Sequence, residues 1–168
     1  MSELARVLAA LWAVKLALIA LRLPRHVECD ALLERARLDA KAELDAAGAQ
    51  VHGGSLPRVR ADAAQLERVF RVLLVNAARH RGAEPPIIHV SARPAGREWQ
   101  FSVRDNGAGI DPARHHDIFN PLTGARELPA CRAIVWRHGG RLWVESAQGQ
   151  GATFHFTLPA TRRMGYAA

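Results

Sequence analysis

The chain has 168 residues, of which 49% are hydrophobic and 23% charged, a balance that excludes wholesale disorder. This length accommodates one ordinary domain with a short appendage. The formal net charge of +7 raises the question of nucleic-acid binding, but Lys and Arg are spread along the chain without a dense basic run, so we expect no nucleic-acid partner.

The first predicted element is an apolar helix that ends before Pro24. Leu and Val recur three and four residues apart, as in the seam of a helical bundle, at Leu4, Val7, Leu11, Val14, Leu18 and Leu21. Lys15 interrupts the apolar run, and about fifteen residues separate Arg6 from Arg22, fewer than the roughly 20 that a membrane span needs. We therefore favour a dimerisation helix over a membrane anchor or an unpaired helix.

The next stretch predicts a second helix followed by two short strands. Asp30 is the expected N-cap and Gly48 the expected C-terminal stop of the helix. Residues 49–52 and 58–61 are then expected to form short strands on either side of a glycine-rich turn.

The remaining elements predict a two-layer fold. Asp62, with Gln65 three residues later, resembles a capping box for an amphipathic helix. Beyond it we expect strands at 87–92 and 98–105, a helical turn at 114–119, a helix at 127–138, and strands at 141–146 and 153–158. This order predicts the α+β class, a two-layer α/β sandwich with helices on one face of a mostly antiparallel sheet. The expected units are an N-terminal helix (1–24), one domain (25–160) and a tail (161–168).

The most informative motif runs from Asp105 to Ile110. A carboxylate ends an apolar strand, and Gly107 and Gly109 follow it directly. A buried carboxylate there can accept a hydrogen bond from an exocyclic amino group such as that of adenine, and glycines let the backbone approach a ligand closely. Taken alone, the same residues also fit an ordinary hairpin turn.

Two further positions could belong to the same site. Asn76 follows an apolar run near the end of its helix, and an amide oxygen suits a hard cation such as Mg²⁺. Arg79, three residues on, shares that face and could reach a phosphate. The alternative for Asn76 is a helix C-cap, and the alternative for the glycine-rich stretch at 149–153 is a plain turn between strands.

Taken in order, these segments resemble the ATPase domain of sensor histidine kinases, a Bergerat-type ATPase fold, and are most similar to kinases of the phytochrome-linked kind. Residues 66–80 resemble the asparagine box, 105–110 the first glycine box, 118–122 the phenylalanine box, and 149–159 the closing strand. The resemblance covers about a hundred residues well and 25–61 more loosely.

The resemblance implies roles for particular residues. Asp105 would bind the adenine amino group, with Thr153 supporting it through water. Gly107 and Gly109, together with the adjoining Ile110, would form the floor of the pocket. Asn76 would hold Mg²⁺ and Arg79 would contact phosphate, so the implied cofactors are ATP or ADP with Mg²⁺.

Several departures from the family pattern bear on activity. The second glycine box reads as residues 123–129 with a single glycine, Gly124, and Glu127 adds negative charge where phosphate should lie. The lid is reduced to about four residues, and Val72 replaces the first asparagine of the asparagine box. The N-terminal helix holds no histidine to accept a phosphoryl group.

We therefore expect a histidine-kinase-like domain of two-component signalling that binds adenine nucleotide but has weak or no kinase activity. The implied partners are a second copy or a kinase, joined through the N-terminal helix, and a response regulator. The alternatives are a scaffold that binds no nucleotide and an active ATPase or serine kinase of the anti-sigma type. Cys29 and Cys131 show no disulfide or metal spacing, which favours a cytoplasmic location.

Overall fold

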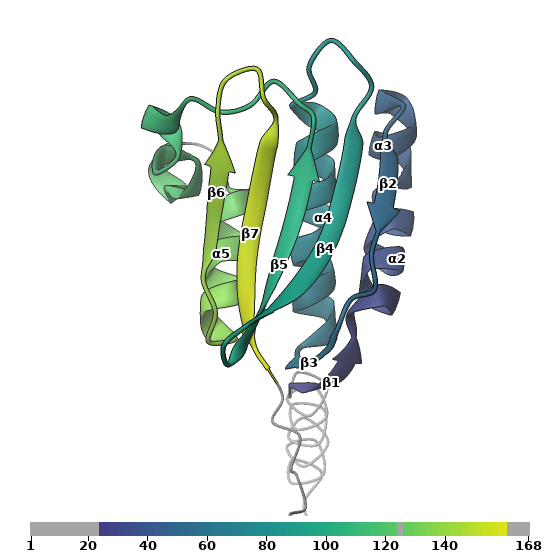
Figure 1. The fold of residues 1–168 in the computed structure, drawn as a ribbon, viewed down its shortest axis with the longest axis vertical. Helices are drawn as coiled ribbons and strands as arrows, with labels where there is room; N and C mark the ends of the chain where they lie inside the picture. Colours follow the sequence, from purple (N-terminus) through teal and green to yellow (C-terminus); the bar gives the residue numbers. More distant parts are fainter. Residues whose placement is uncertain (1–23, 124–125, 161–168) are drawn as a thin grey trace, which may run out of the picture.

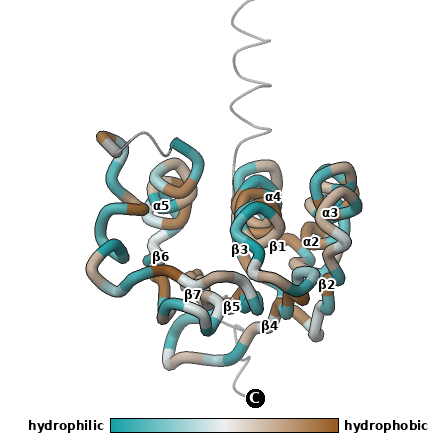
Figure 2. Tube along the Cα trace, turned by 90° about the horizontal axis from the view of Figure 1, so that it is seen from above, coloured by the Kyte–Doolittle hydropathy of each residue, from teal (hydrophilic) through white to brown (hydrophobic). Residues whose placement is uncertain are grey.

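The computed structural model describes residues 24–123 and 126–160, and these form a five-stranded sheet with helices on one face (Figures 1 and 2). The strand order is β2-β4-β5-β7-β6. All neighbouring strands are antiparallel except β2 and β4, which are parallel. The strands are β2 (Gln50–Gly53), β4 (Ile87–Ala95), β5 (Glu98–Asp105), β6 (Leu142–Ser146) and β7 (Ala152–Pro159). The predicted α+β sandwich is confirmed.

The helices lie together on one side of the sheet, as Figure 2 shows, and leave the other side open. They are α2 (Cys29–Asp39), α3 (Lys41–Ala47), α4 (Ala63–Arg79) and α5 (Glu127–Arg137). Three short 3₁₀ turns, Pro112–Arg114, Asp117–Phe119 and Pro121–Thr123, occupy the connection between β5 and α5. This long connection brings irregular backbone close to the end of β5.

The region before α4 differs from its prediction. The single helix expected from Asp30 to Gly48 is two helices, with a break at Ala40. Glu28 rather than Asp30 is the N-cap residue of α2. The Asp30 carboxylate instead accepts a hydrogen bond from the Leu56 backbone N–H at 2.9 Å, so a tertiary contact uses the side chain that the sequence assigned to capping.

The two short strands that follow do not share a sheet. β3 (Arg58–Ala61) pairs antiparallel with β1 (Arg25–Glu28), a strand that the sequence did not predict. β2 instead pairs in parallel with β4 and forms an edge of the main sheet. Local turn residues cannot reveal this arrangement, because both partners lie far away along the chain.

Helix α4 is the central helix of the fold, and its start follows the predicted capping box. The Asp62 side chain accepts a hydrogen bond from the Gln65 N–H at 3.1 Å. The apolar residues of α4 face the sheet, where Phe70 meets Phe101 and Phe156 edge to face. The rings of Phe101 and Phe156 stack on adjacent strands with their centroids 4.6 Å apart. These aromatic contacts fix how α4 lies across β5 and β7.

The predicted N-terminal helix (1–24) and tail (161–168) lie almost entirely outside the described residues. The proposed dimerisation helix and the unit boundaries therefore stay predictions. Within residues 24–123 and 126–160, no helix has both the length and the apolar character needed to cross a bilayer.

Replacing Phe156 by Ala tests the role of the aromatic core. Its ring is fully buried, so Phe156→Ala should lower the free energy of unfolding by about 3–5 kcal/mol, through lost burial and the cavity left behind. Leu38→Ala is the control, because Leu38 is 61% exposed and its truncation should cost less than about 0.5 kcal/mol. Urea unfolding measures both, and similar losses would contradict this description of the core.

Candidate functional site

A cavity of about 910 Å³ lies between the C-terminal half of α4, the start of α5 and the loops that follow β5 and β6. These loops gather at one end of the sheet, opposite β1 and β3 (Figure 1). Of the residues predicted to form a site, Asn76, Arg79, Asp105, Gly109 and Ile110 line this cavity. The fold thus brings together the asparagine of α4 and the motif after β5.

Asp105 is the most buried charged residue of the cavity wall. It is the last residue of β5, is 7% exposed, and lies inside the cavity. Its Oδ1 accepts hydrogen bonds from the backbone N–H groups of Gly107 at 2.8 Å and Ala152 at 3.2 Å. Among the described residues none donates a hydrogen bond to Oδ2, so one carboxylate oxygen can accept a donor from a ligand.

Burial raises the pKa of the Asp105 carboxyl above its ordinary value of 3.8. The hydrogen bonds from Gly107 and Ala152 and the nearby charge of His80 oppose this rise. The desolvation cost of the ionised carboxylate therefore exceeds the stabilisation that its hydrogen bonds and the nearby charge provide. A ligand N–H that donates to Oδ2 would replace part of the hydrogen bonding that the carboxylate loses with its water.

Position 109 has no room for a side chain, because the backbones of two loops are in contact there. Its φ is +72°, and a Cβ atom at this position would overlap the carbonyl oxygen of Ala147. The Gly149 N–H donates to the Ala108 carbonyl at 2.7 Å, and the Ser146 hydroxyl accepts from the Ile110 N–H at 2.8 Å. These contacts fix the loop after β5 against the turn between β6 and β7.

Two predicted residues lie elsewhere. Gly107 packs against the carbonyl of His80 and donates to Asp105, and it is not part of the cavity wall. Thr153 is also absent from the wall, where the preceding Ala152 lies instead. Because successive side chains of a strand point to opposite faces, Thr153 points to the open face of the sheet. The structure therefore does not place its hydroxyl beside Asp105.

The wall of the cavity near α5 combines opposite charges. Arg79 of α4 and Glu127, the first residue of α5, form an ion pair with 3.3 Å between Nη1 and Oε2. Arg114 and Arg126 also line the cavity, as do Asp111 and Asp117. Sequence reasoning missed most of these residues because they lie in irregular segments, where no periodic pattern identifies the face of a side chain.

Apolar side chains complete the wall. Val72 is 3% exposed and lines the cavity with Ile110, Ile118 and Leu128. No group of three or more His, Cys, Asp or Glu side chains within the described ranges could hold a metal ion. Asn76 would therefore need oxygen ligands from a bound molecule to hold Mg²⁺.

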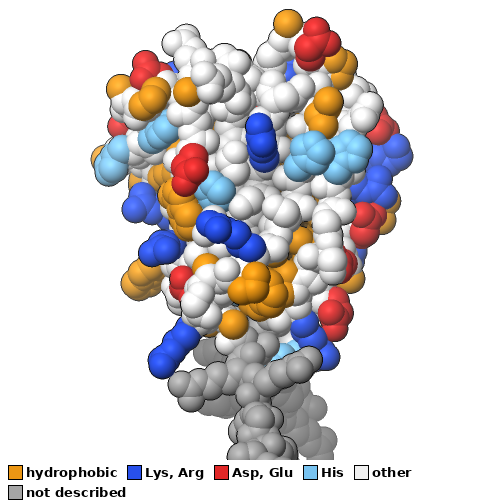
Figure 3. Space-filling view, in the orientation of Figure 1, with side chains coloured by type: hydrophobic (Ala, Val, Ile, Leu, Met, Phe, Trp, Pro, Cys, Tyr) orange, Lys and Arg blue, Asp and Glu red, His pale blue; other side chains and the backbone are white. Residues whose placement is uncertain are grey.

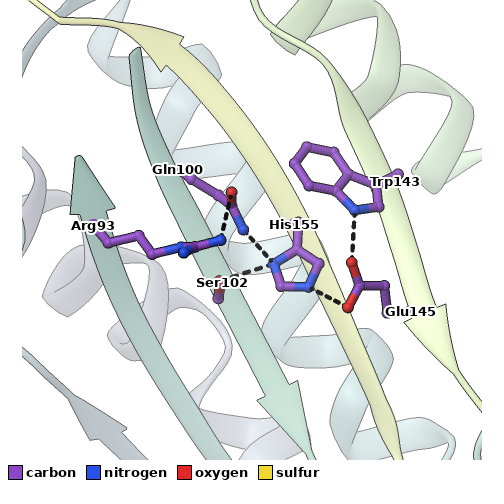
Figure 4. Close-up of polar contacts among 6 residues, drawn as sticks. All are labelled: Arg93, Gln100, Ser102, Trp143, Glu145 and His155. Carbon is purple, nitrogen blue, oxygen red and sulfur yellow. Dashed lines mark hydrogen bonds and ion pairs between the residues drawn. The ribbon is translucent and has the colours of Figure 1, made fainter. Parts of the chain in front are cut away.

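The open face of the sheet carries a separate polar cluster (Figures 3 and 4). His155 on β7 stacks on Trp143, and its Nδ1 lies 2.9 Å from the Ser102 hydroxyl and 3.2 Å from the Gln100 amide. Its Nε2 lies 3.5 Å from Glu145. These residues are on the face away from the helices, so they take no part in the cavity.

Comparison with known proteins identifies the class of this domain. Residues 61–162 match the family described as "Histidine kinase-, DNA gyrase B-, and HSP90-like ATPase". The match covers more than half of the chain, and the chain belongs to this family. It therefore contains a histidine kinase-like ATPase domain, as the order of the sequence motifs predicted.

The similar proteins include phytochromes and sensor kinases. Cyanobacterial phytochrome A of Nostoc sp. strain PCC 7120 is 40% identical over 146 residues, 81% of this chain and 19% of that protein. Phytochrome-like protein Cph1 of Synechocystis sp. strain PCC 6803 is 35% identical over 138 residues, 76% of this chain and 18% of that protein. The chain thus spans about a fifth of the length of these relatives.

Solved structures support the fold. The catalytic domain of histidine kinase ThkA, in a nucleotide-free form, superposes with a TM-score of 0.70 at 22% identity, covering 81% of this chain and 95% of that one. Full-length ShkA in complex with AMPPNP gives a TM-score of 0.70 at 24% identity, covering 83% of this chain and 32% of that one.

Two glycines with the same backbone conformation test the loop contact. Gly109 and Gly149 both have positive φ, +72° and +77°, but only Gly109 has a carbonyl in the path of a Cβ atom. Gly149→Ala should cost about 1–2 kcal/mol from backbone strain. Gly109→Ala should cost about 2 kcal/mol more, because the loops must separate. Equal losses in urea unfolding would show that the two loops are not in close contact.

Proposed function

We propose that this domain binds adenine nucleotide weakly through Asp105 and transfers phosphoryl groups slowly or not at all. The observation that carries the proposal is the Asp105 carboxylate, buried in a cavity. Two backbone N–H groups donate to its Oδ1, and no residue in the described ranges donates to its Oδ2. Family membership supports a nucleotide as the ligand class, because ShkA, which shares the fold, was solved with AMPPNP.

The chemistry around Asp105 suits the amino edge of a purine. An exocyclic amino group donates hydrogen bonds and carries no charge, so it can enter a buried site at low desolvation cost and bond to Oδ2. Ile110, Ile118 and Val72 supply apolar surface for the faces of a planar ring. The adenine end of a nucleotide therefore fits the residues present.

The triphosphate end does not fit them. Arg79, expected to contact phosphate, is paired with Glu127 instead. The carboxylate of Glu127 is itself an anion in the cavity wall. Asn76 lines the same cavity and is proposed to contact Mg²⁺ only when bound phosphate supplies further oxygens. These residues give no arrangement that would stabilise phosphoryl transfer.

The wider role is proposed from the relatives. Sensor kinases of two-component signalling are among the similar proteins, so we place this chain in that kind of signalling, with a response regulator as a proposed partner. Assembly as a homodimer, or with a kinase, is proposed through the N-terminal segment. The proposed location is the cytoplasm. In this role the domain would regulate rather than phosphorylate.

Asp105→Asn tests the nucleotide site directly. The variant keeps an oxygen for Gly107 and Ala152 but loses the charge and presents an N–H to the adenine amino group. The ADP affinity of the variant should be lower than that of the wild type by about tenfold or more. The wild type should bind ATP no more tightly than ADP. Calorimetric titration with Mg²⁺ present measures both.

The matched control is Asp62→Asn, since Asp62 is a similarly buried aspartate outside the cavity and Asn also caps helices well. Its ADP affinity should equal that of the wild type. If neither ligand binds the wild type, the domain is a scaffold without nucleotide. Tight ATP binding with turnover would instead establish an active ATPase or kinase.

The raised pKa of Asp105 predicts a pH dependence of binding. A ligand N–H favours the ionised carboxylate, so affinity should be complete above the pKa of the free site and be lost as the pH falls through it. Asp105→Asn should lose this dependence, whereas protonation of the adenine ring affects both proteins equally. Parallel pH profiles of ADP affinity for the two proteins would contradict a role for this carboxyl group.

A further inference from the structure

We propose that Glu127 makes this cavity selective for adenine ligands with few phosphates, so that adenosine and AMP bind more tightly than ADP and ATP. The inference rests on the proposed function, because it takes the adenine ring to lie at Asp105. It concerns the opposite side of the cavity, where the start of α5 faces the end of α4.

The charges of the cavity wall do not favour a polyphosphate. Among the described residues, four acidic side chains line it against three arginines, a formal charge of −1 if histidine is not counted, although the whole chain carries +7 on the same convention. The arginines are Arg79, Arg114 and Arg126, and the acidic residues are Asp105, Asp111, Asp117 and Glu127. The positive charge of the protein is therefore not concentrated where phosphates would lie.

The ion pair between Arg79 and Glu127 links the two helices that border this side. Both side chains are about half exposed, at 58% and 49%, so the pair is weak by itself. Its consequence is that the Arg79 guanidinium already has a carboxylate partner. A phosphate that approaches Arg79 must displace Glu127 or lie beside a second negative charge.

The start of α5 has also lost much of its capacity to bind an anion. Free N–H groups and the helix dipole make the first turn of a helix a good phosphate site. Here Pro129, the third residue of α5, has no N–H, and Glu127 in the first turn already provides the negative charge that the dipole favours.

These features act on phosphates and leave the adenine contact unaffected. Asp105 is held by Gly107 and Ala152, on the sheet side of the cavity, while Glu127 belongs to a helix on the other side. Each phosphate added to adenosine brings negative charge toward Glu127, and Arg79 is already paired with that carboxylate. Affinity should therefore decrease with phosphate number, instead of increasing as in a site built for ATP.

The test is calorimetric titration of the full chain with adenosine, AMP, ADP and ATP, each without and with Mg²⁺. The wild type should bind adenosine and AMP more tightly than ATP. Glu127→Gln keeps the shape, removes the charge and releases Arg79, so ATP affinity should rise by about fivefold while adenosine affinity stays unchanged.

Glu34→Gln is the matched control, because Glu34 forms a comparable exposed ion pair with Arg37 on α2. This variant should bind all four ligands as the wild type does. Wild-type binding that is tighter for ATP than for AMP, or an unchanged ratio of ATP to adenosine affinity in Glu127→Gln, would overturn the role of Glu127 while leaving adenine binding intact. If none of the four ligands, adenosine included, binds the wild type, both the proposed function and this inference are refuted.

Discussion

The structure of the cavity depends on one buried carboxylate and the backbone groups that hold it. Oδ1 of Asp105 accepts N–H groups from Gly107, two residues later, and from Ala152, at the start of the last strand. A buried charge needs such partners, because its lost hydration costs several kcal/mol otherwise. These bonds fix the end of β5, the loop after it and the turn before β7 in one arrangement.

The two sides of the cavity have different chemistry as a result. On the sheet side, rigid backbone contacts, with Gly109 packed against Ala147, hold the loop in place and leave Oδ2 accessible. On the helix side, α4 and α5 pack through buried residues, and their charges at the cavity, Arg79 and Glu127, form a half-exposed ion pair. The domain has the fold of an ATPase family, and we propose that it keeps an adenine site on the sheet side but not a phosphate site on the helix side.

The sequence predicted most of the main sheet because its signals are local. The alternation of apolar and polar residues along 98–105 predicted β5 with the bounds that the structure has. The pair Asp62 and Gln65 correctly predicted the start of α4. The prediction was wrong where pairing is distant: β1 was missed, and β2 and β3 belong to different sheets. Asp30 was assigned to a cap because sequence cannot show that Leu56 competes for its carboxylate.

By itself the sequence determined the class of the fold, the family and the identity of the central carboxylate, because periodicity, glycine spacing and motif order are properties of neighbouring residues. The tertiary structure alone decided which side chains share the cavity. It placed Ala152 rather than Thr153 in the wall, since one step along a strand reverses the face. It also joined Arg79 to Glu127 across 48 positions, because only packing of α4 beside α5 brings those charges together.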